Sequence, residues 1–290
     1  LPSRATREAM IDLTVFAIPV FFVTMAAEAW ALRRRPDLRG YRGADTRTSL
    51  LMGTGNVLIN LGMKGVQFAC LSWWSRFAPW HLDPSNWQSW VIGFVAVDFA
   101  YYWWHRLSHT SFMWPLHRAH HSAAYMSVRV VYRNNAFYYA LMPGLWFSGV
   151  LLYMGFGWTY VWYSVVKLAV IIGAHSPIRW DRPLYRYTAL RPIAWVLERT
   201  ISTPATHFAH HALTQDDGVG HYMGNYGNLL FIWDVLFGTA RITRQYPPAY
   251  GLKDDIRQGP ERWYTQFLFP IFRSTRAETV LGHQKHIPID

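Results

Sequence analysis

Long apolar stretches alternate with short polar and basic ones along this chain. Five of them approach the roughly 20 apolar residues that a helix needs to cross a bilayer. They are Leu13–Leu32, Leu50–Leu71, Trp87–Trp104, Ala136–Gly157 and Trp158–Gly173. In the second stretch Asn56, Asn60 and Lys64 recur every four residues, so they share one helix face, which we expect to point inward. The fifth is short and can form a tight hairpin with the fourth. The pattern predicts an all-α integral membrane protein with four or five transmembrane helices.

Basic residues orient these predicted helices. Residues 33–47 hold six arginines against two aspartates, whereas residues 72–86 hold one arginine and one aspartate. By the positive-inside rule, residues 33–47 lie in the cytoplasm. We therefore expect residues 179–290 to form a cytoplasmic helical cap, and the localisation to be multi-pass with the functional site on the cytoplasmic side. Residues 1–290 are treated as a single membrane-embedded domain.

Composition narrows the class of protein further. Hydrophobic residues make up 51% of the chain, which excludes intrinsic disorder. The single cysteine, Cys70, excludes a disulfide framework and a cysteine-based metal site. The net charge of +11 suits nucleic acid or an anionic membrane surface. Because the apolar stretches favour the membrane, we expect no nucleic-acid partner.

Eight of the 13 histidines lie in three windows of five residues. The windows have the patterns HxxxH, HxxHH and HxxHH, and residues three and four apart share a helix face. We expect three helical patches of imidazoles that face one another. Imidazole binds zinc, copper, iron and nickel, and eight nitrogens suffice for two metal ions that each keep an open position. The predicted ligands of this polyhistidine di-metal site are His105, His109, His117, His120, His121, His207, His210 and His211.

The residues around the windows carry a family resemblance. In order, they are DFAYYWWHRLSH at 98–109, WPLHRAHHS at 114–122, TPATHFAHH at 203–211 and NYGNLLFIWDVLFGT at 225–239. These segments resemble the histidine boxes and closing signature of the fatty acid hydroxylase/sterol desaturase superfamily of membrane di-iron enzymes. The match covers about residues 91–272, and the first box looks most like that of the alkylglycerol monooxygenase branch.

This resemblance implies an oxidoreductase that uses two iron ions, O2 and two electrons to hydroxylate or desaturate a C–H bond of a lipid or sterol. It implies His175 as a further ligand, since a histidine at this place often accompanies the boxes. The chain shows no flavin, haem or iron–sulfur motif. We therefore expect a separate electron donor, which is a reductase, ferredoxin or cytochrome b5-type protein, or a pterin as in the alkylglycerol monooxygenase branch.

Further residues are candidates to support the ligands, because a ligating histidine usually donates its second nitrogen to a carboxylate or carbonyl. They are Asp98, Asp217, His221, Asn225 and Asp234. Asp217 can equally belong to a solvated turn, and His221 can equally be a surface-loop histidine. The alternative function is non-oxidative, either a membrane lipid isomerase or a metal-binding membrane protein. An isomerase needs one or two acid–base residues rather than eight histidines, so metal content separates the two classes.

Overall fold

The computed structural model describes residues 19–20, 22–34, 43–74, 77, 86–154 and 157–276. In these residues the regular elements are helices, apart from two isolated antiparallel bridges. Residues 22–33 are helical, and the labelled helices of eight or more residues are α2 (Gly43–Trp74), α3 (Trp87–Ser108), α4 (Trp114–His121), α6 (Pro143–Tyr153), α7 (Gly157–His175) and α9 (Arg191–Thr200). The shorter ones are η3 (Val128–Val130), α5 (Ala136–Ala140), α8 (Arg182–Arg186), η4 (Thr188–Leu190), α10 (Pro204–His210), α11 (Ile232–Leu236), α12 (Lys253–Gln258) and α13 (Trp263–Leu268). The all-α part of the prediction is confirmed.

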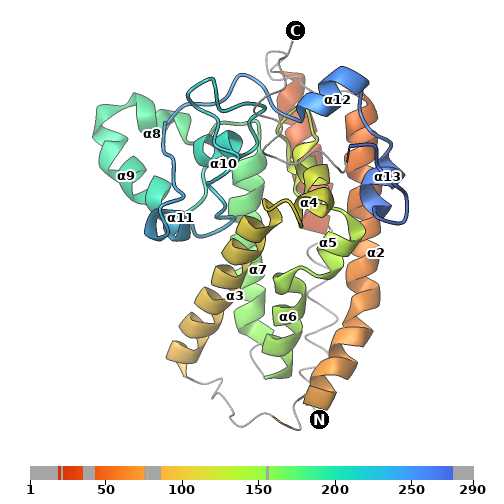
Figure 1. Ribbon diagram of the computed structural model, residues 1–290. Coiled ribbons are helices and arrows are strands. Elements are labelled where there is room, and N and C mark those ends of the chain that lie inside the picture. The colour runs from red at the N-terminus through yellow and green to blue at the C-terminus, as the bar shows by residue number, and fades with distance from the viewer. Residues whose placement is uncertain are drawn as a thin grey trace.

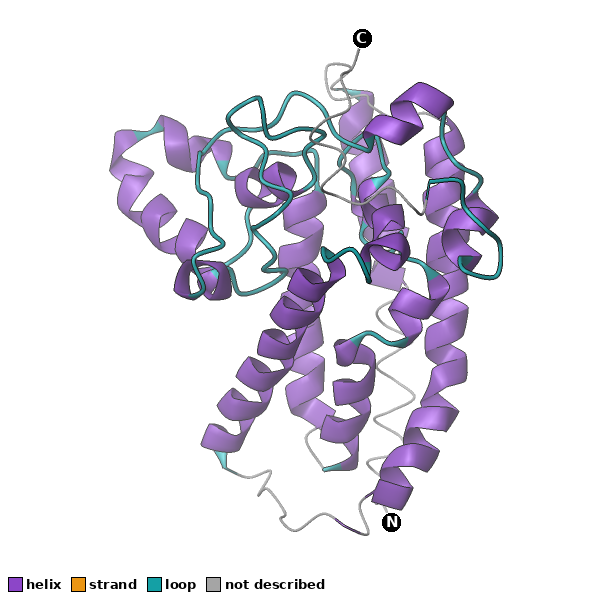
Figure 2. Cartoon of the chain, in the orientation of Figure 1, coloured by secondary structure: helices purple, strands orange, loops and turns teal. Residues whose placement is uncertain are grey.

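The helices are arranged on two levels (Figure 1). The long helices α2, α3 and α7 run through the lower level, where α6 packs against all three. The short helices α8 to α13 gather with α4 at the upper level, and long loops connect α10 to α11 and α11 to α12 (Figure 2). The C-terminal ends of α3 and α7 reach this upper level, so the lower helices support whatever lies between the levels.

Local sequence explains where the key helices begin. Asn86 caps α3, since its side chain accepts a hydrogen bond from the Gln88 amide at 3.0 Å. Thr203 and Thr206 form a reciprocal capping box at the start of α10, with Pro204 as the first helical residue. These caps fix the register of two helices that carry box histidines.

The polar face of α2 points inward, as predicted. Asn56 is fully buried and donates hydrogen bonds to the backbone carbonyls of Tyr132 (3.0 Å) and Asn134 (2.9 Å). Asn60 borders a cavity described below. The side chain of Lys64 lies outside the described part of the structure. The amide of Asn56 thus holds the non-helical segment before α5 against α2.

None of the helices in the described residues combines the length and the apolar content needed to cross a bilayer. The prediction of four or five transmembrane helices, with a multi-pass localisation and a cytoplasmic cap, is therefore wrong. The stretch Ala136–Gly157 divides, because Pro143 begins a new helix, and the 11 residues of α6 extend only about 16 Å against a bilayer core of about 30 Å. α2 is long but carries polar residues, and residues 13–18 and 21 of the stretch Leu13–Leu32 lie outside the described residues.

Candidate metal centre

Four helices end at one buried region between the two levels. His109 caps the C-terminal end of α3, and α4, α7 and α10 end on His121, His175 and His210. The C-terminal end of a helix carries a partial negative charge, which typically stabilises a nearby cation by about 0.3–1 kcal/mol. The backbone dipoles of these helices therefore favour a positive charge in this region, independently of the side chains.

All nine predicted ligands lie in this region, in two groups. Within each group the possible ligand atoms lie within 4.8 Å of one another, so each group could hold a metal ion. The first group consists of His105, His109, His117, His121 and His210, and the second of His120, His175, His207 and His211. Every one of these side chains is buried.

The two groups alternate along α4 and along α10 with its cap His211. His117 and His121 are four residues apart and belong to one group, whereas His207 and His211 have the same spacing and belong to the other. His120 and its neighbour His121 belong to different groups, because adjacent positions on a helix are rotated by about 100°. The second and third windows therefore each serve both groups, a division that the sharing of a helix face does not predict.

The ring nitrogens within a group are as close as ligands of one metal ion. Nε2 of His207 lies 3.0 Å from Nε2 of His175 and 3.1 Å from Nε2 of His211, and Nε2 of His210 lies 3.0 Å from Nε2 of His105. Two nitrogens bound to one ion at about 2.1 Å lie about 3 Å apart when the bonds meet at right angles. The donor set therefore fits two imidazole-bound metal ions.

Unpaired nitrogens in the same rings give a second test of this fit. His109 and His117 are buried, yet neither nitrogen of either ring has a hydrogen-bond partner. Leaving a buried polar group unpaired costs about 1–3 kcal/mol. Because a metal ion accepts the lone pair of one nitrogen in each ring, it would satisfy groups that the protein leaves open.

Backbone carbonyls set the orientation of three of the rings. The Nδ1 atoms of His105, His210 and His175 lie 2.6, 2.7 and 2.9 Å from the carbonyl oxygens of Tyr226, Gly224 and Ile171, respectively. A carbonyl only accepts hydrogen bonds, so each Nδ1 carries the proton and each Nε2 presents a lone pair to its group. The predicted supporting groups were all side chains, and these three carbonyls were not among them. The closing signature, which contains Tyr226 and directly follows Gly224, was the available signal for two of the three.

Burial also keeps these histidines in the neutral form that binds metal. It lowers the pKa of His105 and of His175 from 6.5 to about 4, and it lowers the pKa of the other seven well below 6.5. The neighbouring imidazoles lower it further in eight of them, and Lys167 lowers it further in His105. Since a protonated imidazole cannot bind a metal, the site is ready to do so at neutral pH.

Asp234 and Asn225 support the ligands through the backbone. The fully buried Asp234 accepts hydrogen bonds from the amides of Tyr226 (2.8 Å) and Gly227 (2.6 Å), and it thereby fixes the loop whose carbonyl orients His105. Asn225 has a positive φ of 55° and donates to the carbonyl of Thr206 at 2.9 Å, within α10. Both side chains bond to the backbone that positions the histidine rings rather than to the rings themselves.

The other three supporting candidates lie elsewhere. Asp217 accepts hydrogen bonds from two amides of its own turn, and the His221 ring contacts the carbonyl of Thr239 at 3.2 Å. Asp98 accepts hydrogen bonds from the Trp233 indole at 2.9 Å and the Leu230 amide at 3.2 Å, so it joins α3 to the segment that carries α11. No hydrogen bond in the described residues joins these three side chains to a box histidine.

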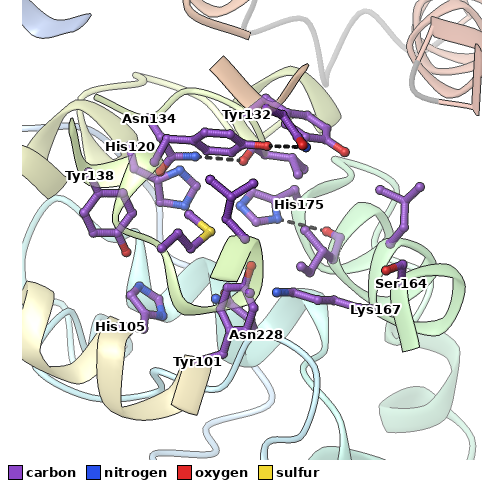
Figure 3. Close-up of a pocket in the computed structure, with 18 of the residues that line it drawn as sticks. Tyr101, His105, His120, Tyr132, Asn134, Tyr138, Ser164, Lys167, His175 and Asn228 are labelled. Atoms are coloured by element: carbon purple, nitrogen blue, oxygen red, sulfur yellow. Dashed lines mark hydrogen bonds between the residues drawn. The ribbon is translucent and has the colours of Figure 1, made fainter. Parts of the chain in front are cut away.

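A cavity of about 220 Å³ opens beside both histidine groups (Figure 3). His105 and His117 of the first group and His120 and His175 of the second line one side of it. The rest of its wall includes five tyrosines, three asparagines and a few aliphatic side chains. A molecule in this cavity would therefore lie against both groups at once.

Lys167 is the charged side chain in the wall of this cavity. It is partly buried, and its Nζ lies 2.7 Å from the ring centroid of Tyr101. Burial lowers the pKa of the amine well below its usual value, while the nearby Asp98 raises it. In the sequence, Lys167 is only a charge within the apolar stretch Trp158–Gly173. No sequence pattern connected it to the histidines.

Comparison with known proteins identifies the family. The family model for fatty acid hydroxylases matches residues 90–239, which is just over half of the chain and contains all nine of these histidines. The chain belongs to the fatty acid hydroxylase family. The resemblance to this superfamily inferred from the boxes is thus confirmed.

Curated relatives of this fatty acid hydroxylase family member agree with the predicted branch. The chain is 27% identical to alkylglycerol monooxygenase of Xenopus tropicalis over 84% of its own length and 51% of the relative's. It is 26% identical to alkylglycerol monooxygenase of Homo sapiens over 88% and 53%, and 28% identical to ornithine lipid hydroxylase OlsE of Rhizobium tropici over 69% and 56%. The chain thus spans about half the length of these relatives. No solved structure matches it.

Proposed function

We propose that this protein is a di-iron lipid monooxygenase, which inserts one oxygen atom of O2 into a C–H bond of a lipid. The observation that carries the proposal is that two groups of buried histidines border one cavity. The names of the relatives, which hydroxylate or oxygenate lipids, support the same class of reaction. In balanced form, R–H, O2, two electrons and two protons give R–OH and water.

Nine histidines would hold the iron ions. The first group of five would bind one ion and the second group of four the other, and iron is among the metals that imidazole binds well. Bound there, the two ions would supply the oxygen-activating chemistry that acid–base side chains lack. The ring tautomers fixed by the carbonyls of Tyr226, Gly224 and Ile171 keep the lone pairs aimed at these positions.

The protein's own contribution to catalysis is the orientation of the substrate. The cavity would hold the carbon to be oxidised beside His117 and His120, one from each group. Burial raises the pKa of Tyr138, whose ring centroid lies 4.8 Å from that of His117, so its hydroxyl keeps its proton. Lys167 at the opposite wall would donate a hydrogen bond to an oxygen atom of the lipid and so fix which carbon faces the metals.

The two electrons would come from a separate donor, which is a reductase, ferredoxin or cytochrome b5-type protein, or a pterin. Hydroxylation is proposed over desaturation because the relatives are a monooxygenase and a hydroxylase by name.

Lipid mass spectrometry tests this function directly. Cells that produce the wild-type chain should accumulate a lipid that is one oxygen atom heavier than a lipid of control cells. The same cells producing His120→Ala/His210→Ala, which removes one ligand from each group, should lack this product. An unchanged product in the double variant would contradict the proposal.

A further inference from the structure

The hydroxyl of Tyr102 on α3 begins a chain of hydrogen bonds that runs in one direction. The Thr239 hydroxyl donates to a carboxylate oxygen of Asp234 at 2.6 Å, so the Thr239 proton is already engaged. The Tyr102 hydroxyl lies 3.0 Å from the Thr239 oxygen and accepts a hydrogen bond from Arg106 at 3.1 Å. Tyr102 must therefore donate its own proton to Thr239. Two hydrogen bonds in sequence thus lead from the phenol to a carboxylate.

The carboxylate at the end of this chain is suited to take up the phenolic proton. Asp234 is completely buried, and burial raises the pKa of its carboxyl group above the usual value. Tyr102 is buried as well. The positive charge of Arg106 beside the Tyr102 oxygen opposes a second positive charge on that ring. If Tyr102 loses an electron, its proton therefore has to leave at the same time, and the path through Thr239 to Asp234 is in place.

Aromatic rings connect Tyr102 to the first histidine group on one side and to the exterior on the other. The ring centroid of Tyr226 lies 6.3 Å from that of Tyr102. It lies 5.2 Å from that of His109 and 5.9 Å from that of His105, two members of the first group. On the other side, the ring centroid of Trp103 lies 5.8 Å from that of Tyr102, and Trp103 is partly exposed. Because electron tunnelling weakens steeply with distance, rings in such close contact exchange electrons readily. We call Tyr226, Tyr102 and Trp103 the aromatic route.

We propose that Tyr102 is a redox-active tyrosine, through which the aromatic route passes electrons from the surface to the first histidine group. This use of the route rests on the proposed function, since a metal ion at that group has to accept the electron. It gives the protein a second activity, the reduction of oxygen to water when no lipid lies in the cavity.

The second activity balances with thiols in solution as the additional reductant. O2, four electrons and four protons give two molecules of water. Two of the electrons come from the donor that serves hydroxylation, and two protons come from the solvent. The other two electrons enter at Trp103 from two thiols, which join in a disulfide and release the remaining two protons. Each electron that leaves Tyr102 is replaced from Trp103, and the proton held by Asp234 then returns to the phenol.

Such a route protects the histidines from the chemistry that they support. Without a C–H bond in reach, the oxidising power that remains after the first two electrons would fall on the nearest side chains, which are the imidazoles. Tyrosine and tryptophan lose an electron more easily than imidazole does. Electrons supplied by Tyr102 would therefore spare the ligands.

A flash experiment on the full chain without bound metal tests the route by itself. Leu107 is exposed and lies one helical turn after Trp103, so Cys70→Ser/Leu107→Cys carries one thiol for a ruthenium photo-oxidant beside the tryptophan. After excitation, a cobalt(III) salt in solution accepts an electron from ruthenium, and the oxidised ruthenium takes one from Trp103. We expect the transient absorption of a tyrosyl radical. Tyr102→Phe should abolish it, whereas the matched control Tyr101→Phe should not.

Thr239 gives a measurement that a purely structural role of these residues would not affect. Thr239→Val keeps the shape of the side chain but removes the hydroxyl, so the phenolic proton loses its path to Asp234. Thr239→Ser keeps the hydroxyl. We expect the radical to be lost in the valine variant and preserved in the serine variant, at equal helix content by circular dichroism. Equal radical yields in these two variants, or an undiminished yield in Tyr102→Phe, would overturn the proposal.

The connection to the histidines is tested with iron-loaded protein and electron paramagnetic resonance. With O2 and a reductant but no lipid, the wild type should form a tyrosyl radical that an added thiol removes. Tyr102→Phe at equal iron content should lack this radical and should accumulate oxidised histidine, measured by mass spectrometry of its peptides. An iron-loaded wild type without the radical, or with a radical that persists in Tyr102→Phe, would overturn the proposal. Failure of the chain to bind iron would instead overturn the proposed function, and with it this use of the route, whatever the flash experiment shows.

Discussion

His120 and His121 are neighbours in the chain, but their rings belong to different histidine groups, with centroids 5.6 Å apart and planes 83° to each other. The ring centroid of His120 lies 4.6 Å from that of His211, which belongs to the second group. The ring centroid of His121 lies 5.0 Å from that of His117, which belongs to the first group and is four residues earlier. One turn of α4 therefore supplies ligands to both groups. This division makes the proposed two-metal site testable one group at a time.

Paired substitutions should separate the two groups. His105→Ala/His210→Ala removes two ligands of the first group only, and His175→Ala/His207→Ala removes two of the second only. We expect each variant to stay folded and to keep one metal ion per chain, measured by elemental analysis after metal loading.

The adjacent pair His120 and His121 gives the decisive test of the division into two groups. His120→Ala/His121→Ala also removes two ligands, but one from each group, and should weaken the binding of both ions in a metal titration. His221→Ala is the control, because its ring contacts a carbonyl outside the groups. If all three double variants lost both ions alike, the division into two groups would be incorrect.

A change of Asp234 to Asn should reduce metal affinity or turnover without touching a ligand. The amide group has one oxygen in place of two, so it can no longer accept from both the Tyr226 and the Gly227 amides, and the carbonyl that orients His105 loosens. We expect a loss of about 10–100-fold, as is usual for groups that orient ligands. Asp217→Asn is the matched control, since that carboxylate accepts hydrogen bonds within its own turn. A similar loss in both variants would refute this role for Asp234.

Replacement of Lys167 by Met should change substrate use while leaving the metals in place. Methionine fills similar space but cannot donate a hydrogen bond, so the lipid would bind less tightly or with another carbon beside the metals. We expect a KM raised by about tenfold or more, since a lost hydrogen bond in a buried site costs about 1–3 kcal/mol, or a shifted hydroxylation position, at normal metal content. Unchanged KM and product would exclude a positioning role, as would a loss of metal.

The stability of the metal-free chain should depend on pH in the acid range. Burial holds the pKa of His105 and of His175 at about 4, whereas in the unfolded chain it returns to about 6.5. Between these values the unfolded state binds more protons, so the free energy of unfolding falls as the pH is lowered from about 6.5 to about 4. Denaturant titrations at several pH values should show this fall, and His105→Gln/His175→Gln should reduce it. A wild-type curve without slope would contradict the described burial.

The histidine spacing predicted which side chains meet but not how they divide between the two groups. A separation of four residues places His105 beside His109 and His207 beside His211, and this follows from helix geometry alone. The partners across the site, such as His120 with His175, depend on where the C-terminal ends of α4 and α7 lie in the fold, which no local pattern records. The residue type does not mark the supporting carbonyls, since every residue has one, and only the closing signature at Tyr226 pointed toward two of them.

The apolar stretches correctly predicted helices but wrongly predicted that these helices cross a bilayer. The stretch Ala136–Gly157 appears continuous by composition, and the break comes from one residue, Pro143, which has no amide hydrogen to continue the ladder of α5. Asn56 was correctly placed on an inward face, because a buried amide needs partners and the segment before α5 offers two carbonyls.

The central claim, that the two histidine groups support oxygen insertion into a lipid, is tested most directly with ¹⁸O₂. Cells producing the wild-type chain would be grown under ¹⁸O₂, beside cells producing His120→Ala/His210→Ala, and their lipids analysed by mass spectrometry. We predict one lipid species that gains a single ¹⁸O atom in the wild type and not in the double variant. The account is contradicted if no lipid gains the label specifically in the wild type, or if the added oxygen comes from labelled water instead.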